Sequence, residues 1–478
     1  MSALYISSVR WLSLLKVLDA LLQSILRLFL TWILVPQEFG IYGGALLFIG
    51  LVQTTTQTGV IQALIQKKNM HELLNTGWTL QVIRGALIYV LIYFLTPLYV
   101  AFMEVDTQES MINAIRILGL LIIFDSFKNI GVITFDKEIN FDKVFKLEIS
   151  GLLVKFFATL FFTLLLESFY GLVYGTLLGY ITVFLMSYIL SSYRPRIEVD
   201  KEKILSILNY GVWVFIFSIT NFLIIRINEL FLLKFVGLEE LAIFQLALFM
   251  ALFARDSITQ IQSRIVFPII SRYQNSGRIV RKVFVKNFQM ASLIYIPIGT
   301  FLFAVSYELV QVFLGLNWRI VSEVLPYLSI AAIFSSFTAI IEKFYNGLGI
   351  PNRVFFFSIL SLLVLLLSVN FIFGYGLVEI SKSFLVATTF HFILIFSYFV
   401  KFSSLKLTDF GSKSLFTFLR SFFPFLSIQL CLFLFDLNSL ISLILGSIFS
   451  FSLYFVLILL SDKSIQRAIL KDYLRIAK

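Results

Sequence analysis

Charged and amide side chains occur inside segments of this chain that are otherwise apolar. The first such segment, 11–35, carries Lys16, Asp19, Gln23 and Arg27. In a helix with 100° between successive residues, these four side chains fall on one face and form a single polar stripe. A charge at the centre of a bilayer costs roughly 2.5–3.5 kcal/mol on insertion scales. The stripe is therefore expected to face a cavity or a partner rather than lipid.

Further polar side chains lie at mid-depth in other apolar segments. They are Gln53, Gln57, Arg84, Asp125, Lys128, Lys155, Arg226, Glu229, Arg255 and Asp256. Asp125 and Lys128 are three residues apart, as are Arg226 and Glu229, so each combination can form an ion pair on one helix face or can face a ligand. Arg84 and Lys155 have no acid at this spacing, and we expect them to contact a ligand.

Arginine and lysine in a wet cavity within a membrane suit an anion. Arginine favours phosphate or pyrophosphate because its guanidinium presents paired N–H donors. The predicted substrate-binding set is Arg27, Arg84, Lys155, Arg226, Arg255, Gln23, Gln53 and Gln57. The candidates for binding a coupling proton or sodium ion are Asp19, Glu229 and Asp256. The sequence has no HExxH, P-loop, GxSxG or cysteine-pair motif, so neither a catalytic site nor a metal or other cofactor is predicted.

The composition places these segments in a membrane. Of the 478 residues, 59% are hydrophobic and 14% are charged, against about 45–50% and about 25% in soluble domains. A helix needs about 20 apolar residues to cross the hydrocarbon core. The apolar runs predict an all-α polytopic protein with fourteen spans, near 11–35, 41–64, 79–102, 112–135, 146–166, 169–190, 205–236, 241–265, 287–314, 323–346, 354–373, 378–400, 416–436 and 439–460. The first span is too long and too charged for a cleaved signal peptide.

Basic residues indicate the cytoplasmic side. Loops on one side of the predicted spans carry most of the lysine and arginine, whereas those on the other side hold only Lys234, Arg319 and Lys382. Cytoplasmic loops carry this excess, so both termini are predicted to be cytoplasmic. The net charge of +11 is then mainly a topology signal, and nucleic-acid binding is not expected. The single cysteine, Cys431, cannot form an internal disulfide.

A weak internal repeat predicts the domain organisation. A shift of 202 residues aligns 36–42 with 238–244 and matches Glu38 with Glu240. An even number of spans per unit makes the repeat parallel. We predict an N-terminal six-helix lobe, a C-terminal six-helix lobe, two additional spans and a cytoplasmic tail, at 1–193, 194–402, 403–461 and 462–478. The tail is either an amphipathic helix on the inner leaflet or a solvated basic segment.

Two local features predict how the lobes pack. The polar centres of 41–64 and 241–265 are equivalent in the repeat, which indicates a central cavity shared by the two lobes. Gly171, Gly175 and Gly179 follow one another at intervals of four on the segment 169–190. Small residues at this spacing allow two helices to approach closely.

Six short segments match motifs of a known family in order and spacing. They are LVPQEFGIY at 34–42, TGVIQALIQ at 58–66, LQVIRG at 80–85, KEINF at 137–141, RIVFPIISR at 264–272 and GLGIP at 347–351. The chain thereby resembles the polysaccharide transporter family of the multidrug/oligosaccharidyl-lipid/polysaccharide exporter superfamily, particularly its Wzx-type, colanic-acid-exporter-like branch.

The resemblance implies a flippase of the bacterial cytoplasmic (inner) membrane. Its implied substrate is an undecaprenyl-pyrophosphate-linked oligosaccharide, an O-antigen or exopolysaccharide repeat unit, moved by alternating access between two lobes. Membrane lipids and polysaccharide polymerase machinery are the other implied partners. Asn228 stands where the family pattern has an aspartate, and Phe249 where it has an arginine. The family's ion-coupling site is therefore not carried over to this chain.

Two other functions stay open, and a third is disfavoured. A drug or metabolite exporter of the same superfamily predicts a cavity of carboxylates and aromatic rings rather than cations. A membrane-embedded glycosyltransferase or polymerase would need catalytic groups and would form new glycosidic linkages from a lipid-linked substrate. A scaffold without transport activity would not explain charges at mid-depth in several helices.

Overall fold

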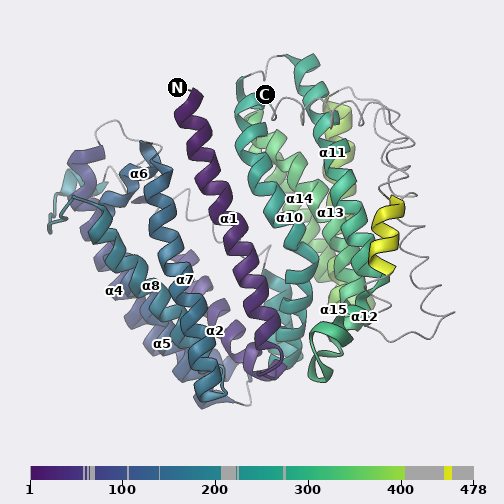
Figure 1. Cartoon of the computed structure of the whole chain (residues 1–478), viewed down its shortest axis with the longest axis horizontal. Helices are drawn as coiled ribbons and strands as arrows, with labels where there is room; N and C mark the ends of the chain where they lie inside the picture. Colours follow the sequence, from purple (N-terminus) through teal and green to yellow (C-terminus); the bar gives the residue numbers. More distant parts are fainter. Residues whose placement is uncertain are drawn as a thin grey trace. The chain divides into compact units, whose positions relative to one another are not determined.

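The computed structural model describes residues 2–56, 60–61, 64, 70–104, 107–138, 140–205, 222, 226–272, 276–403 and 446–454. Every regular element in this part of the chain is a helix, and it contains no strand (Figure 1). The all-α class predicted from the composition is confirmed for these residues.

Contacts between residues divide the chain into two compact units. The first comprises Met1–Gln245 and Tyr375–Leu377, and the second comprises Leu246–Gly374 and Val378–Lys478. The lobe and tail bounds predicted from the sequence remain predictions. Both additional spans and the tail lie outside the described residues, except for 446–454, which are helical.

The first unit is built of long helices joined by short connections. It contains α1 (Ser2–Leu30), α2 (Pro36–Thr55), α4 (Met70–Met103), α5 (Gln108–Phe127), η1 (Ile130–Val132), α6 (Ile133–Lys137), α7 (Phe141–Leu166), α8 (Tyr170–Leu190) and the start of α10 (Leu238–Arg272). Helix α5 packs against α2, α4 and α8, and α7 packs against α1 and α8. These contacts bring polar residues from α2, α4 and α5 together.

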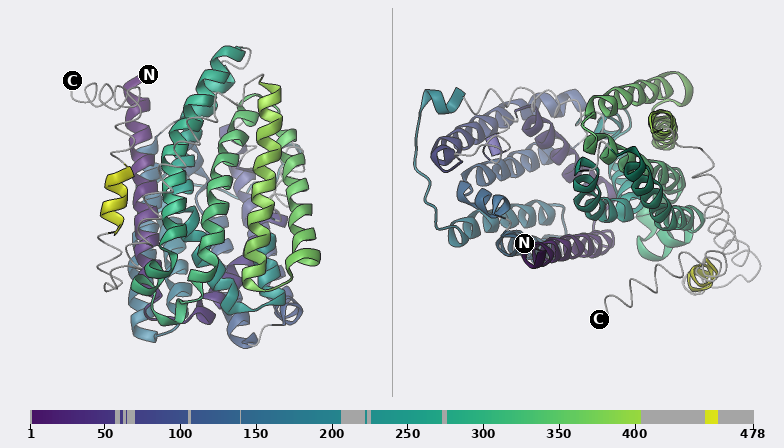
Figure 2. Two further views of the ribbon diagram at one scale, coloured as in Figure 1. Left: turned by 90° about the vertical axis from the view of Figure 1, so that its right-hand side faces the viewer. Right: turned by 90° about the horizontal axis from the view of Figure 1, so that it is seen from above.

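The second unit has an aromatic core. Its further elements are α11 (Gly277–Ala304), α12 (Ser306–Phe313), η2 (Leu316–Trp318), α13 (Val321–Gly347), α14 (Pro351–Ser368), η3 (Val369–Phe373) and α15 (Leu377–Phe402). The ring of Phe284 in α11 lies 4.9 Å from that of Phe344 in α13 and 4.2 Å from that of Phe399 in α15, between centroids. Figure 2 shows the long helices of this unit, in teal and green, side by side.

Eight helices of the described chain are long and apolar enough to cross a membrane. They are α4, α5, α7, α8, α11, α13, α14 with its continuation to Phe373, and α15. All eight overlap segments predicted as spans, so the chain is a multi-pass membrane protein. The full count of fourteen spans and the cytoplasmic placement of the termini remain predictions.

The predicted span 112–135 is not one continuous helix. Helix α5 ends at Phe127, and Lys128 has extended backbone angles of φ −52° and ψ 141°. The side-chain oxygen of Asn129 then accepts a hydrogen bond from the N–H of Gly131 at 2.9 Å and starts the turn η1. An interrupted helix at membrane depth is tolerated where the freed backbone groups are buried in protein or line a cavity. The break therefore indicates a polar space beside α5.

Helices α7 and α8 approach closely along a stripe of small residues. A Cβ atom on Gly175 would lie 2.0 Å from Thr159 Oγ1 and 2.6 Å from the Thr159 backbone nitrogen. A Cβ atom on Gly179 would lie 2.8 Å from Lys155 Cβ. Gly171 makes the same kind of contact. The close approach predicted from the glycine spacing is confirmed.

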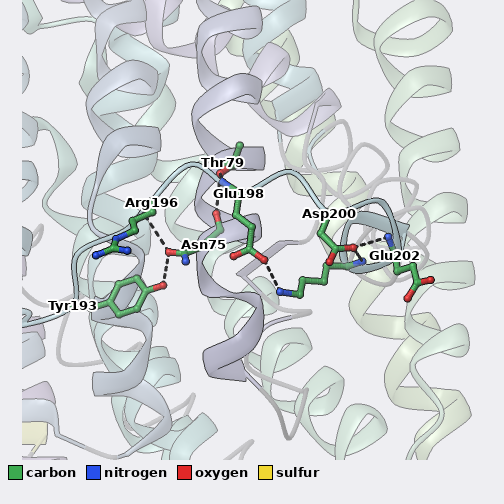
Figure 3. A network of polar contacts seen from close by, with 8 residues as sticks. Asn75, Thr79, Tyr193, Arg196, Glu198, Asp200 and Glu202 are labelled. Atoms are coloured by element: carbon green, nitrogen blue, oxygen red, sulfur yellow. Dashed lines mark hydrogen bonds and ion pairs between the residues drawn. The ribbon is translucent and has the colours of Figure 1, made fainter.

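The extended segment 191–200, which follows α8, lies across α4 (Figure 3). We call this segment the strap. The Tyr193 hydroxyl donates to Asn75 Oδ1 at 2.6 Å, and the Arg196 N–H donates to the same oxygen at 3.0 Å. Further along, the Glu198 N–H donates to Thr79 Oγ1 at 3.0 Å. Asn75 and Thr79, near the start of α4, thus hold the segment that follows the sixth predicted span.

The strap ends in a helix cap and an ion pair, both visible in Figure 3. Asp200 Oδ1 accepts from the N–H groups of Glu202 at 2.9 Å and Lys203 at 3.2 Å. The Lys203 ammonium donates to Glu198, which lowers the pKa of the Glu198 carboxyl and raises the pKa of Lys203.

The stabilisation from this pair has a defined pH window. The contribution of Glu198 is present above the ordinary carboxyl pKa of about 4.3 and is lost as the pH falls through the lowered pKa of the folded state. That of Lys203 is present below about 10.4 and is lost as the pH rises through its raised pKa. The pair is therefore intact at neutral pH. Because it lies at the surface, it is weakened by salt.

We expect Asn75→Ala to loosen the strap, because Asn75 Oδ1 is the shared acceptor of two hydrogen bonds. Losing about 1–2 kcal/mol would raise the population of the open strap by a factor of about 5–30. Limited trypsin digestion of the purified protein in detergent should show this as faster cleavage after Arg196, which precedes Ile197. Asn352→Ala, at an exposed position of α14, is the control. Cleavage of Asn75→Ala at the wild-type rate would show that Asn75 does not hold the strap.

Candidate functional site

Residues of α2, α4 and α5 surround a pocket inside the first unit. The pocket has a volume of about 320 Å³. Arg84, Asp125 and Lys128 are its charged lining residues, and Gln53 and Gln81 add side-chain amides. The other polar lining residues are Thr54, Ser126 and Asn129. The pocket lies where α2 ends and where α5 is interrupted.

Arg84 of α4 holds the end of α2. Its Nε–H donates to the Thr56 carbonyl at 2.7 Å, and its Nη2 donates to the Gln53 carbonyl at 3.1 Å. Its Nη1 donates to Gln81 Oε1 at 3.3 Å. The last carbonyls of a helix lack intrahelical partners and carry partial negative charge, so a guanidinium is favourable there. Arg84, expected from the sequence to contact a ligand, also has this structural role.

Asp125 and Lys128 face each other across the break in α5. The distance from Lys128 Nζ to Asp125 Oδ1 is 3.8 Å, so the ion pair predicted from their spacing is confirmed. At this distance the pair is electrostatic and is not a hydrogen bond. The Lys128 side chain is 27% exposed and the Asp125 side chain is 46% exposed, although both residues lie within a predicted span. Both charges line the pocket and are accessible from it.

A second polar group surrounds the buried carboxylate of Glu229, whose side chain is 2% exposed. Its Oε1 accepts from Arg226 Nη1 at 2.5 Å, and its Oε2 accepts from Gln245 Nε2 at 2.5 Å. Gln245 of α10 also lies against α2, since a Cβ atom on Gly43 would be 2.2 Å from Gln245 Oε1. The predicted pairing of Arg226 with Glu229 is confirmed.

Arg27 of α1 lies near the same carboxylate. It interacts electrostatically with Tyr42, Arg226 and Glu229. The Tyr42 hydroxyl forms a hydrogen bond with the Thr176 hydroxyl of α8 at 2.9 Å. We call Arg27, Tyr42, Arg226, Glu229 and Gln245 the Glu229 group. Its two guanidinium groups outnumber its one carboxylate, so it carries net positive charge among apolar helices.

Tyr180 of α8 lies within electrostatic range of both the pocket and the Glu229 group. It interacts electrostatically with Asp125 of the pocket and with Tyr42 of the Glu229 group. Polar residues of several helices thus share one region inside the first unit. This arrangement can bind an anion and form hydrogen bonds with hydroxyl groups.

The second unit places Arg255 between α10 and α13. Arg255 Nη1 donates to Ser335 Oγ of α13 at 2.7 Å. Glu342, on the same helix as Ser335, interacts electrostatically with Arg255. A carboxylate is therefore within range of this guanidinium.

The other predicted site residues are distributed over several helices. Asp19 and Gln23 are half-buried on α1. Lys155 is half-buried on α7, with its Cβ in the contact with α8. Gln57 lies outside the described residues, as does the side chain of Asp256, whose backbone belongs to α10. No group of three or more His, Cys, Asp and Glu residues suited to a metal occurs in the described part of the chain.

Among the partners of the predicted site residues in the first unit, Tyr42, Gln81 and Gln245 are not predicted from the sequence. For Gln245 the sequence does hold an indication, because the 202-residue repeat aligns this residue with Gly43. In the structure these two positions are in contact. Gln81 stands three residues before Arg84, a spacing at which side chains on one helix face meet, so this spacing is a signal for its contact. Tyr42 is an isolated polar residue in an apolar helix, and no spacing distinguishes it.

The fold is that of transporters of the MOP superfamily. The chain superposes on a lipid II flippase MurJ in an inward closed conformation with a TM-score of 0.73, covering 98% of this chain and 99% of the other at 15% identity. It superposes on an inward-facing multidrug resistance MATE family transporter of that superfamily with a TM-score of 0.68, covering 82% of this chain and 98% of the other at 13% identity. These similarities show that the chain has the same multi-pass helical fold.

The chain belongs to the polysaccharide biosynthesis protein family, whose family model matches residues 29–323. It is 24% identical over 338 residues to the lipopolysaccharide biosynthesis protein WzxC of Escherichia coli (strain K12), covering 69% of this chain and 67% of WzxC. It is 22% identical over 295 residues to the teichuronic acid biosynthesis protein TuaB of Bacillus subtilis (strain 168), covering 59% of this chain and 58% of TuaB.

These relatives confirm the resemblance inferred from the six sequence motifs. Together with the eight apolar helices, they show that the chain is a multi-pass protein of the bacterial inner membrane and that it takes part in polysaccharide biosynthesis.

Proposed function

We propose that this protein is a flippase that moves an undecaprenyl-pyrophosphate-linked oligosaccharide across the inner membrane by alternating access. The family supports a role in polysaccharide biosynthesis. The similarity in fold to a protein titled lipid II flippase supports a lipid-linked substrate. Fourteen spans with both termini in the cytoplasm, and a cavity shared by two lobes, are parts of this proposal.

The observation that carries the proposal is the excess positive charge of the Glu229 group. Glu229 is hydrogen-bonded to Arg226 and lies within electrostatic range of Arg27, so one carboxylate faces two guanidinium groups. Charges at membrane depth are costly and usually mark a substrate or ion pathway. Two guanidinium groups at one place provide the forked donors that match pyrophosphate oxygens.

Other residues contribute in the same proposal. Arg84, Lys155 and Arg255 would supply further positive charge along the path, and amides would contact the glycan. Those amides are Gln23, Gln53 and Gln57. Asp19, Glu229 or Asp256 would bind the coupling proton or sodium ion. The isoprenoid tail would remain among membrane lipids, and polysaccharide polymerase machinery would receive the product outside.

Flipping by purified protein in proteoliposomes tests the proposal. The substrate is a fluorescent undecaprenyl-pyrophosphate-linked oligosaccharide, and its arrival in the other leaflet is followed by quenching from outside. Wild type should accelerate flipping over protein-free liposomes. Arg27→Gln should slow it by about 10-fold or more, because a hydrogen bond to a charged group contributes about 1.5–3 kcal/mol.

Arg278→Gln is the matched control, because it removes an exposed arginine at the start of α11 and should flip at the wild-type rate. Wild-type flipping by Arg27→Gln would exclude Arg27 from the pyrophosphate site. Absence of flipping by wild type, together with export of free organic cations, would favour a drug exporter. New glycosidic linkages on the lipid-linked substrate would favour an enzyme.

A further inference from the structure

Two helix ends line the pocket beside α5. Helix α2 ends at Thr55, within the predicted span 41–64, and α5 ends at Phe127, within the predicted span 112–135. The backbone groups left without intrahelical partners at a helix end are polar and can line a binding cavity. The pocket is therefore a built polar site and is distinct from the Glu229 group.

The charged groups of the pocket keep unused hydrogen-bonding capacity. Arg84 donates three hydrogen bonds within the described residues, and a guanidinium has five N–H groups. Lys128 lies 3.8 Å from Asp125, beyond hydrogen-bonding distance, so this contact occupies none of its three N–H donors. For the same reason, the contact leaves the Asp125 carboxylate able to accept hydrogen bonds.

The balance of charge and polar groups selects the ligand. The two cations suit an anionic group, and the Asp125 carboxylate beside them accepts hydrogen bonds from hydroxyl groups, which a sugar has and an ionised pyrophosphate lacks. The Asp125 carboxylate, the amide of Gln81 and the hydroxyls of Thr54 and Ser126 suit a ligand with several hydroxyl groups. A volume of about 320 Å³ is at the lower end of small-molecule pockets, roughly 300–1,000 Å³. It suits one sugar rather than an oligosaccharide.

We propose that this pocket binds one acidic sugar, a monosaccharide unit with a single carboxylate, within the translocated glycan. The carboxylate lies between Arg84 and Lys128, and the ring hydroxyls donate to Asp125 and Gln81. This inference rests on the proposed flippase function and extends it to the class of sugar. Lys128 and Asp125 are then specificity-determining residues, separate from the residues that hold the pyrophosphate.

Binding to the full-length protein in detergent provides the first test. The probes are D-glucuronate and D-glucose, measured by saturation-transfer NMR. Glucuronate should bind, and Lys128→Gln should weaken its binding by about 10-fold or more, because an ionic hydrogen bond is lost. Lys146→Gln removes an exposed lysine of α7 and should bind glucuronate like wild type. Equal binding of glucuronate by Lys128→Gln and wild type would overturn the proposal, as would equal binding of glucose and glucuronate by wild type.

Flipping distinguishes failure of this inference from failure of the proposed function. Two lipid-linked oligosaccharides are compared, one with a uronate and one with a neutral sugar at the same position. Lys128→Gln should slow flipping of the first about 10-fold and leave the second unchanged. If wild type flips neither substrate, the flippase function is wrong. If wild type flips both and Lys128→Gln treats them alike, the function stands and the acidic-sugar pocket is wrong.

Discussion

Replacing Glu229 by alanine should lower the free energy of unfolding by about 2–3 kcal/mol. The carboxylate is buried and accepts one hydrogen bond on each oxygen, from Arg226 and from Gln245. Its removal takes the acceptor from the Gln245 amide and leaves Arg226 and Arg27 to repel each other. Breaking a fully buried pair costs roughly 3–5 kcal/mol, and the smaller value here follows from the 46% exposure of the Arg226 side chain.

Thermal unfolding in detergent, followed by intrinsic fluorescence, measures this effect. Glu229→Gln should lie between wild type and Glu229→Ala, because the amide keeps one acceptor and loses the charge. Glu239→Ala is the matched control, since Glu239 is exposed in the first turn of α10. A melting temperature for Glu229→Ala equal to that of Glu239→Ala would show that the Glu229 group does not stabilise the fold.

Gly175→Ala should destabilise the first unit by about 3 kcal/mol, at the upper end of the usual cost of overpacking. The new Cβ would lie 2.0 Å from Thr159 Oγ1, 2.6 Å from the Thr159 nitrogen and 2.7 Å from its Cα. A side-chain rotation of Thr159 relieves only the first of these contacts. Helices α7 and α8 must therefore move apart, which weakens the packing over their whole length.

The same substitution at Gly277 is the control. Nothing lies within 4 Å of a Cβ at that position, in the first turn of α11. Gly277→Ala should be neutral or stabilising by up to about 1 kcal/mol, because alanine loses less backbone entropy than glycine on folding. Melting temperatures in detergent compare the two variants. Equal melting temperatures would mean that α7 and α8 do not depend on this close contact.

Much of the fold could be predicted because its signals are local. Twenty or so consecutive apolar residues identify a membrane span without reference to the rest of the chain. The glycine spacing in α8 predicts a close helix contact for the same reason, and the i,i+3 spacing predicts the pairs Asp125–Lys128 and Arg226–Glu229. Each of these signals lies within one helix, whose geometry is known in advance.

The sequence by itself thus determined the membrane class, the positions of the spans found in the structure, and which charged residues lie in or beside them. Only the tertiary structure decided which groups those charges meet. Arg84 donates to carbonyls about 30 residues earlier in the chain, and Gln245 reaches Glu229 from another helix. The break in α5 also depends on a contact with Ser187 of α8. Such partners are set by how helices pack and not by the period of one helix, because many pairings of apolar faces satisfy the same local pattern.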